Sequence, residues 1–141
     1  MCIRDSTVRR AREMNQGLID LINSDGKAPW TVGVLRRHLL SPGFYLFVGY
    51  VNDTPVAMAS LTPLSEGTAL SDVITHQAHR GKGYARTLLH QVVAHHRRTS
   101  RNMLYLFASD PVAIHIYEQL GFVEQENSPL MWSAFLPGSS L

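Results

Sequence analysis

The feature that most restricts the fold is one amphipathic helix flanked by two short apolar runs. The helix is indicated by apolar residues that recur on one helical face, namely Ala85, Leu88, Leu89, Val92 and Val93. The runs at residues 69–75 and 103–108 are typical of strands. Strands joined by a helical crossover lie parallel in one sheet, with a right-handed connection. The sequence therefore predicts a βαβ unit over residues 69–108.

The segments around this unit extend the sheet. Aromatic and β-branched residues at 44–51 and 56–62 predict two strands, which form an antiparallel meander with 69–75, and we expect a loop at 63–68. The remaining expected elements are strands at 7–11, 122–123 and 130–136 and helices at 14–22, 31–40 and 111–120. Together they predict an α/β (α+β) fold. Its central sheet is mixed and largely antiparallel, with six to seven strands flanked by four helices.

Composition limits the organisation of the chain and its classes of partner. The 141 residues suit a single domain, expected at 7–136, after a disordered leader at 1–6 and before a tail at 137–141. The single cysteine, Cys2, excludes a disulfide framework within the chain, and no apolar run reaches the roughly 18 residues of a membrane helix. We therefore expect a cytoplasmic protein with no membrane partner. The net charge of only +2 indicates no nucleic-acid partner.

A glycine-rich loop between the first strand of the βαβ unit and its helix is the clearest candidate ligand site. Gly81 and Gly83 let the backbone come close to a ligand, and the helix after Gly83 begins with unpaired N–H groups. Such a helix N-terminus binds anions, above all phosphate, and Arg80 and Lys82 add positive charge there. The spacing of the glycines and Lys82 fits neither a P-loop nor the dinucleotide fingerprint.

Two motifs resemble those of the GCN5-related N-acetyltransferase (GNAT) superfamily. The first is Arg-x-x-Gly-x-Ala, met by Arg80, Gly83 and Ala85, which in that family is the acetyl-CoA pyrophosphate loop. The second is the segment at residues 113–122, which is similar to the family's fourth helix. One helix and one strand separate the two motifs, as the family's fold requires. The resemblance covers residues 7–136 and implies a GNAT-like acyl-CoA N-acyltransferase fold.

The resemblance implies an N-acetyltransferase that moves an acetyl group from acetyl-CoA, its co-substrate, to a primary amine by direct attack in a ternary complex. The pantetheine arm would pair with the strand before the glycine loop, where a backbone N–H would polarise the acetyl carbonyl. Asp110 stands where the family often has Asn, and it is also a suitable N-cap before Pro111. The residues implied to bind acetyl-CoA are Val73, Ile74, Thr75, Arg80, Gly81, Lys82, Gly83, Tyr84, Ala85, Asp110 and Ala113.

The resemblance also implies catalytic roles. Tyr117 matches the family's general acid for the departing thiolate, and a phenol, with an ordinary pKa of about 10, is protonated at neutral pH. The alternative is that Tyr117 is one apolar member of the helix stripe. Asp72 and His76, on or just after the strand that precedes the glycine loop, are the candidate bases. Deprotonation of the amine through a water chain is a third route.

Other interpretations stay open. Trp30, Phe44, Tyr45 and Trp132 are candidates for an acceptor pocket, which the resemblance would place between the first two helices and the last hairpin. We expect no metal site, because the histidines of the central helix lack a ligand-pair spacing. The alternatives to an acetyltransferase are a non-catalytic acyl-CoA-binding module on the same fold and, with less support, a small nucleic-acid-binding domain. A homodimer is left open.

Overall fold

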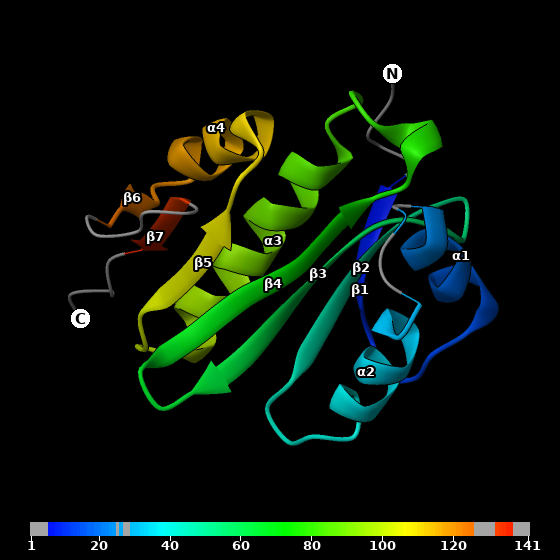
Figure 1. The fold of residues 1–141 in the computed structure, drawn as a ribbon, viewed down its shortest axis with the longest axis horizontal. Coiled ribbons are helices and arrows are strands. Elements are labelled where there is room, and N and C mark those ends of the chain that lie inside the picture. Colours follow the sequence, from blue (N-terminus) through cyan, green and yellow to red (C-terminus); the bar gives the residue numbers. More distant parts are fainter. Residues whose placement is uncertain (1–5, 25, 27–28, 126–131, 137–141) are drawn as a thin grey trace.

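The computed structural model describes residues 6–24, 26, 29–125 and 132–136, which form one seven-stranded sheet with helices on both faces (Figure 1). The strands are β1 (Ser6–Ala11), β2 (Tyr45–Val51), β3 (Thr54–Leu64), β4 (Gly67–Thr75), β5 (Leu104–Ala108), β6 (Val123–Glu124) and β7 (Trp132–Leu136). The α-helices are α1 (Gln16–Ser24), α2 (Thr31–His38), α3 (Tyr84–Thr99) and α4 (Pro111–Gln119), and a 3-10 helix, η2, spans Gln77–His79. Residues 1–5 of the expected leader and the expected tail at 137–141 lie outside the described residues.

The strands follow the order β1-β2-β3-β4-β5-β7-β6 across the sheet. β4 and β5 are parallel, as the predicted βαβ unit requires, and every other neighbouring pair in the described sheet is antiparallel. The predicted meander of β2, β3 and β4 and the mixed sheet with four flanking helices are therefore confirmed for these residues.

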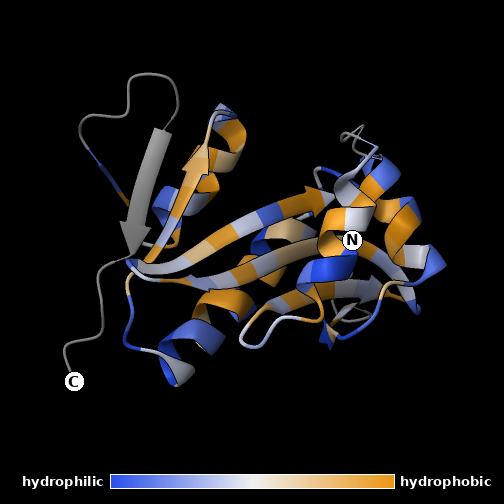
Figure 2. Ribbon diagram, turned by 60° about the horizontal axis from the view of Figure 1, so that its bottom comes forward, coloured by the Kyte–Doolittle hydropathy of each residue, from blue (hydrophilic) through white to orange (hydrophobic). Residues whose placement is uncertain are grey.

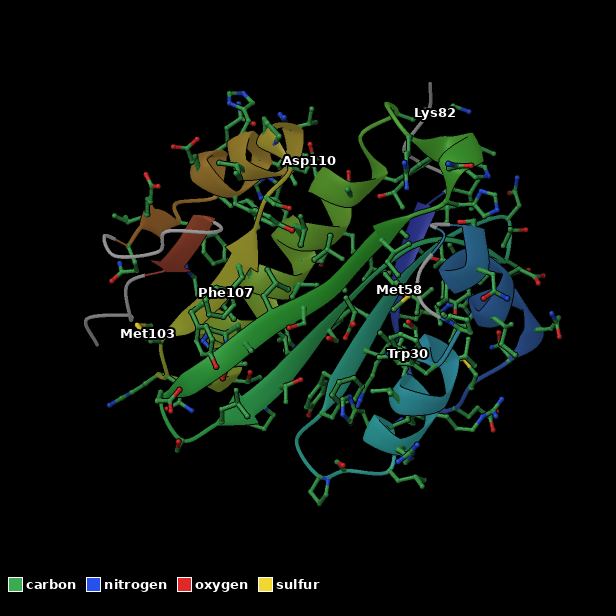
Figure 3. The ribbon with its side chains drawn as sticks, viewed as in Figure 1. Trp30, Met58, Lys82, Met103, Phe107 and Asp110 are labelled. Carbon is green, nitrogen blue, oxygen red and sulfur yellow. The ribbon has the colours of Figure 1, made fainter. Side chains whose placement is uncertain are left out.

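Each face of the sheet has its own hydrophobic core. α3 and α4 cover one face, where Leu88, Leu104 and Tyr117 belong to one buried cluster. α1 and α2 cover part of the other face, where Leu18 and Met58 are fully buried (Figure 3). Figure 2 shows the hydrophobic residues along the strands and on the sheet-facing sides of the helices. Within the part of the chain that the structure describes, no helix has the length and hydrophobicity needed to span a bilayer.

The connection between β3 and β4 is shorter than the sequence indicated. The predicted loop at 63–68 is wrong, because β3 continues to Leu64 and β4 begins at Gly67. Gly67 has φ +154°, and a Cβ there would lie 2.5 Å from the carbonyl oxygen of Met103. The same oxygen accepts a hydrogen bond from the Thr68 N–H at 2.7 Å. Gly67 therefore lets the start of β4 pack directly on the start of β5, which sets the register of the parallel pair.

Candidate active site

β4 and β5 pair only at their first residues and then separate. The described ladder consists of Thr68 opposite Leu104 and Ala69 opposite Tyr105, although β4 continues to Thr75. Figure 1 shows the two strands diverging toward their C-terminal ends, below α4. Beyond Ala69, the backbone of β4 on this side has no strand partner among the described residues. Its amide groups are therefore available to pair with an extended ligand.

A cleft of about 670 Å³ opens at this divergence, a volume within the range of small-molecule sites. The end of β4, the glycine loop, the start of α3 and one side of α4 form its walls. The lining residues are Val73, Thr75, His79, Arg80, Gly81, Gly83, Tyr84, Ala85, Arg86, Leu89, Asp110, Val112, Ala113, Ile116 and Tyr117.

The glycine loop aims the N-terminus of α3 at the cleft. Gly81 and Gly83 have φ values of 77° and 82°, in the left-handed region that glycine adopts without strain. Gly83 is the N-cap residue, so the N–H groups of Tyr84 and Ala85 begin the helix beside the cleft. The Arg80 Nε donates to the Thr75 carbonyl at 3.2 Å and ties the loop to the end of β4. These features together make a positively polarised cradle for an anion.

Tyr117 forms part of the opposite wall, on α4. Its ring is buried and meets the Phe122 ring edge-on at 5.9 Å between centroids. Burial, followed by the nearby carboxylate of Asp110, raises the pKa of Tyr117 to about 12. Tyr117 is therefore a phenol, able to donate a hydrogen bond, throughout the neutral range.

Asp110 is also the N-cap of α4, as predicted, because its side chain accepts from the Val112 N–H at 3.2 Å.

A β-bulge in β4 sends two consecutive side chains to different sites. Met58 pairs with Ile74 and Ser60 with Ser71, so Asp72 and Val73 both lie opposite the residue between Met58 and Ser60. Asp72 has φ 53°, a left-handed conformation that Asp tolerates better than most residues. Bulges of this kind redirect side chains at the edges of active sites.

The bulge places Val73 in the cleft and Asp72 in a smaller hollow on the other face of the sheet. This hollow, of about 210 Å³, is lined by Trp30, Thr31, Val34, Leu35, His38 and Asp72. The hydroxyl of Ser60, a fully buried residue of β3, lies 2.8 Å from the Asp72 Oδ2 and donates to it. It also lies 3.1 Å from the Ser71 carbonyl oxygen, so its one proton is shared between two acceptors.

Most of the sequence-predicted acetyl-CoA residues line the cleft, but two do not. The Ile74 side chain is buried in the core beneath α1 and α2, so only its backbone is available to a ligand. Lys82 is exposed at the outer tip of the loop (Figure 3). Of the two candidate bases, Asp72 lies in the smaller hollow, and His76 caps η2 with its Nδ1, which accepts from the Ala78 N–H at 3.1 Å.

The candidate acceptor aromatics also separate. Trp30 lines the smaller hollow and is 71% exposed, whereas Phe44 is buried in the core beneath α1 and α2. Tyr45 packs against His95 on the α3 face, with 4.9 Å between ring centroids. Trp132 belongs to β7, and its side chain lies outside the described residues.

Several lining residues were not expected from the sequence, namely His79, Arg86, Leu89, Val112 and Ile116. Arg86 and Leu89 follow Gly83 at helical spacing, and Val112 and Ile116 flank Ala113 and Tyr117 on α4, so a helical projection from the predicted residues could have found them. His79 carries no such signal. Its Nδ1 is buried without a hydrogen-bond partner among the described residues, and burial, Lys82 and His76 lower its pKa.

Among the described residues, no group of three or more His, Cys, Asp or Glu side chains is arranged to hold a metal ion.

Comparison with known proteins bears on the fold and the family. The sequence profile of the Acetyltransferase (GNAT) family matches residues 15–122, and no curated protein matches the chain. Among solved structures, the ribosomal-protein-S18-alanine N-acetyltransferase from Escherichia coli is similar, with 18% identity, a TM-score of 0.77 and 96% of each chain covered.

Two further similar structures contain coenzyme A or acetyl-CoA. The PaiA N-acetyltransferase from Thermoplasma acidophilum, in complex with coenzyme A, has 11% identity and a TM-score of 0.75, with 93% of this chain and 99% of that chain covered. A GNAT family acetyltransferase from Elizabethkingia anophelis with acetyl-CoA bound has 14% identity and a TM-score of 0.72, with 94% and 98% covered. At sequence identities of 11–18%, these similarities show that the fold is shared and no more.

Proposed function

Because the chain belongs to the Acetyltransferase (GNAT) family, we propose that it transfers the acetyl group of acetyl-CoA to a primary amine by direct attack in a ternary complex. One observation carries the proposal: the cleft between the end of β4, the glycine loop and α4 joins an anion cradle at one end to a buried phenol on the facing wall. Such a cleft suits a long ligand with phosphates at one end and a reacting thioester at the other.

Acetyl-CoA is proposed to lie with its pyrophosphate at the N-terminus of α3. There it would accept hydrogen bonds from the first N–H groups of the helix, supported by the positive charges of Arg80 and Arg86 beside the cleft. Lys82 would contribute from outside, as a screened charge rather than a contact. The pantetheine arm would follow the open edge of β4, where its amides replace the missing strand partner.

The acetyl carbonyl is proposed to lie at the bulge. A backbone N–H within 73–75 would donate to its oxygen and stabilise the negative charge that develops there during attack, as in an oxyanion hole. Val73 and Thr75 line the cleft, and the role requires only backbone atoms. Acetyl-CoA in the cleft would exclude water from such a donor and so strengthen the interaction.

The proposed step forms one bond and breaks another. The lone pair of the neutral amine nitrogen attacks the thioester carbonyl carbon, and the carbonyl π pair moves to oxygen. When the carbonyl re-forms, the C–S bond breaks with its electron pair on sulfur, which takes the proton of Tyr117. The nitrogen then releases one proton, which returns to Tyr117 through solvent. The products are the N-acetylated amine and CoA as a free thiol.

The amine arrives as an ammonium ion and has to lose one proton before it attacks. We propose Asp72, directly or through water, as the acceptor of this proton. His76 is less suited, because its Nδ1 already accepts from the Ala78 N–H, and the neutral ring then carries its proton on Nε2. That ring has no remaining acceptor nitrogen.

Two assays test the proposal together. Calorimetry with acetyl-CoA should show binding that Gly83→Glu abolishes, since a carboxylate would stand at the cradle and the φ of 82° disfavours any side chain. A thiol-release assay over a panel of primary amines should show acetyl-CoA-dependent turnover. Binding without turnover on any amine would instead identify an acyl-CoA-binding module. Absence of binding would contradict the proposal altogether.

A further inference from the structure

The smaller hollow beside Asp72 indicates which amines the protein accepts. We propose that it holds the body of the acceptor, and that the acceptor is a primary amine with one positive charge and a compact, uncharged, apolar body. The inference rests on the acetyl transfer proposed above and adds the substrate class. Its basis is the position of the hollow, its charge, its apolar wall and its size.

The position follows from the bulge. Asp72 lines the hollow and Val73 lines the cleft, so the two sites meet across one strand. The hollow and the cleft therefore lie on either side of the bulge in β4, where we propose that the acetyl carbonyl lies. Trp30 lies at the start of α2, on the face of the sheet opposite α3 (Figure 3). An acceptor in the hollow would therefore approach the thioester from the side that acetyl-CoA leaves open.

The charge of the hollow favours a single cation. Among the described residues that line it, Asp72 alone is acidic, and the Ser60 hydroxyl holds its carboxylate in place at 2.8 Å. No other described lining residue carries a negative charge that would neutralise a second ammonium group. The last turn of α2 instead carries Arg36, Arg37 and His38, which disfavour a polycation on that side. An acceptor with its own carboxylate near the amine would be repelled by Asp72.

The walls and the size favour a compact apolar body. Trp30, Val34 and Leu35 present apolar surface, and Trp30 is 71% exposed, so a ligand that covers its indole would bury surface that water now contacts. The hollow of about 210 Å³ corresponds to roughly seven water molecules at their liquid volume. That is room for one ring or a short branched chain, and not for an extended peptide.

The experiment compares three amines at saturating acetyl-CoA in the thiol-release assay. They are 2-phenylethylamine, with a compact apolar body, ethanolamine, with a polar one, and spermidine, a polycation. The inference predicts a kcat/KM for 2-phenylethylamine at least about tenfold above those of the other two, the discrimination expected when an apolar group fills an apolar pocket. In parallel, calorimetry measures the binding of 2-phenylethylamine to the full chain saturated with CoA, which requires no turnover.

Matched variants locate the effect. Trp30→Ala should raise the KM and the dissociation constant for 2-phenylethylamine about tenfold, with the KM for acetyl-CoA unchanged. Leu40→Ala is the control, because Leu40 is 84% exposed just beyond α2 and does not line the hollow, and it should change neither quantity. Asp72→Asn should weaken binding of all three amines.

The outcomes separate this inference from the proposed function. A preference for ethanolamine or spermidine, or a Trp30→Ala variant that behaves as the wild type does, overturns the substrate class while acetyl transfer stands. If acetyl-CoA binds and no amine is acetylated, the proposed function fails, and calorimetry still tests whether the hollow binds an amine. Trp30-dependent binding of 2-phenylethylamine then supports the hollow as an amine site, and absence of binding refutes it.

Discussion

Replacing Tyr117 with Phe should slow turnover without weakening acetyl-CoA binding. Burial and the Asp110 carboxylate raise the pKa of Tyr117 to about 12, so the side chain remains a hydrogen-bond donor across the working pH range. A positioned general acid contributes about 10²–10⁴-fold to a rate. The departing group is a thiolate, and thiols have a pKa of about 8.5, so it needs less help than an alkoxide would. We therefore expect the lower end, a loss of about 100-fold in kcat, or about 2.7 kcal/mol in the barrier.

The high pKa adds a second expectation for the same residue. Complete proton transfer from a phenol of pKa about 12 to a thiolate whose acid has a pKa of about 8.5 is uphill by roughly 5 kcal/mol. Transfer therefore has to be concerted with C–S cleavage, and a thioester with a better leaving group should depend less on Tyr117. The kcat of the wild type should also show no decline from Tyr117 ionisation near pH 10, where an ordinary tyrosine ionises.

The assay is thiol release for kcat and calorimetry for the dissociation constant of acetyl-CoA. Tyr105→Phe is the control, since it removes the same hydroxyl from β5, outside the cleft, and should leave both quantities unchanged. The reasoning is refuted if Tyr117→Phe keeps more than about a third of the wild-type kcat, or if acetyl-CoA affinity falls as far as kcat does. The second result would assign Tyr117 to the core rather than to the chemistry.

Three further predictions concern stability and positioning. Gly67→Ala should lower the free energy of unfolding by about 3 kcal/mol or more, seen as a fall in Tm of about 10 °C, because the added Cβ would lie 2.5 Å from a backbone oxygen. Gly33→Ala is the matched control, because Gly33 lies in α2 with open space around it. This variant should raise the free energy of unfolding by about 0.5–1 kcal/mol. The pKa of Tyr117 in the folded protein lies above its ordinary value. Its contribution of about 3 kcal/mol to the free energy of unfolding is therefore present below pH 10 and lost as the pH rises toward 12. Over this range the urea midpoint should fall more steeply for the wild type than for Tyr117→Phe. Ser60→Ala removes the hydroxyl that lies 2.8 Å from the Asp72 carboxylate, so the KM for the amine should rise several-fold while the KM for acetyl-CoA is unchanged. The free energy of unfolding should fall by about 1 kcal/mol. Equal changes in both KM values would contradict a positioning role for Ser60.

The sequence predicted the parts of the fold that local physics determines. The α3 stripe and the capping of α4 by Asp110 each depend on residues near one another in the chain, and the parallel order of β4 and β5 follows from the helix that connects them. The structure has all three. The predicted loop at 63–68 is wrong for a non-local reason. Gly67 suggested a turn, but it is required by the close approach of Met103, which is distant in the sequence.

The candidate site likewise has one part that the sequence could predict and one part that it could not. The glycine loop is a local motif, so its residues lie at the cleft as the pattern indicates, apart from the exposed Lys82. The bulge at Asp72 is not local. One extra residue opposite β3 reverses which face each later side chain occupies, and alternation along β4 alone gives no sign of it. For the same reason the partnership of Ser60 with Asp72 across two strands could not be predicted.

The most direct test of the central claim is amide hydrogen exchange, read residue by residue, with and without acetyl-CoA. If acetyl-CoA lies between β4 and β5 with its pyrophosphate on α3, exchange should slow at Tyr84, Ala85 and Arg86 and along the open edge of β4. α1, on the opposite face of the sheet, should be unchanged. Slowed exchange confined to the C-terminal end of α3, with none at the glycine loop or β4, would contradict the account.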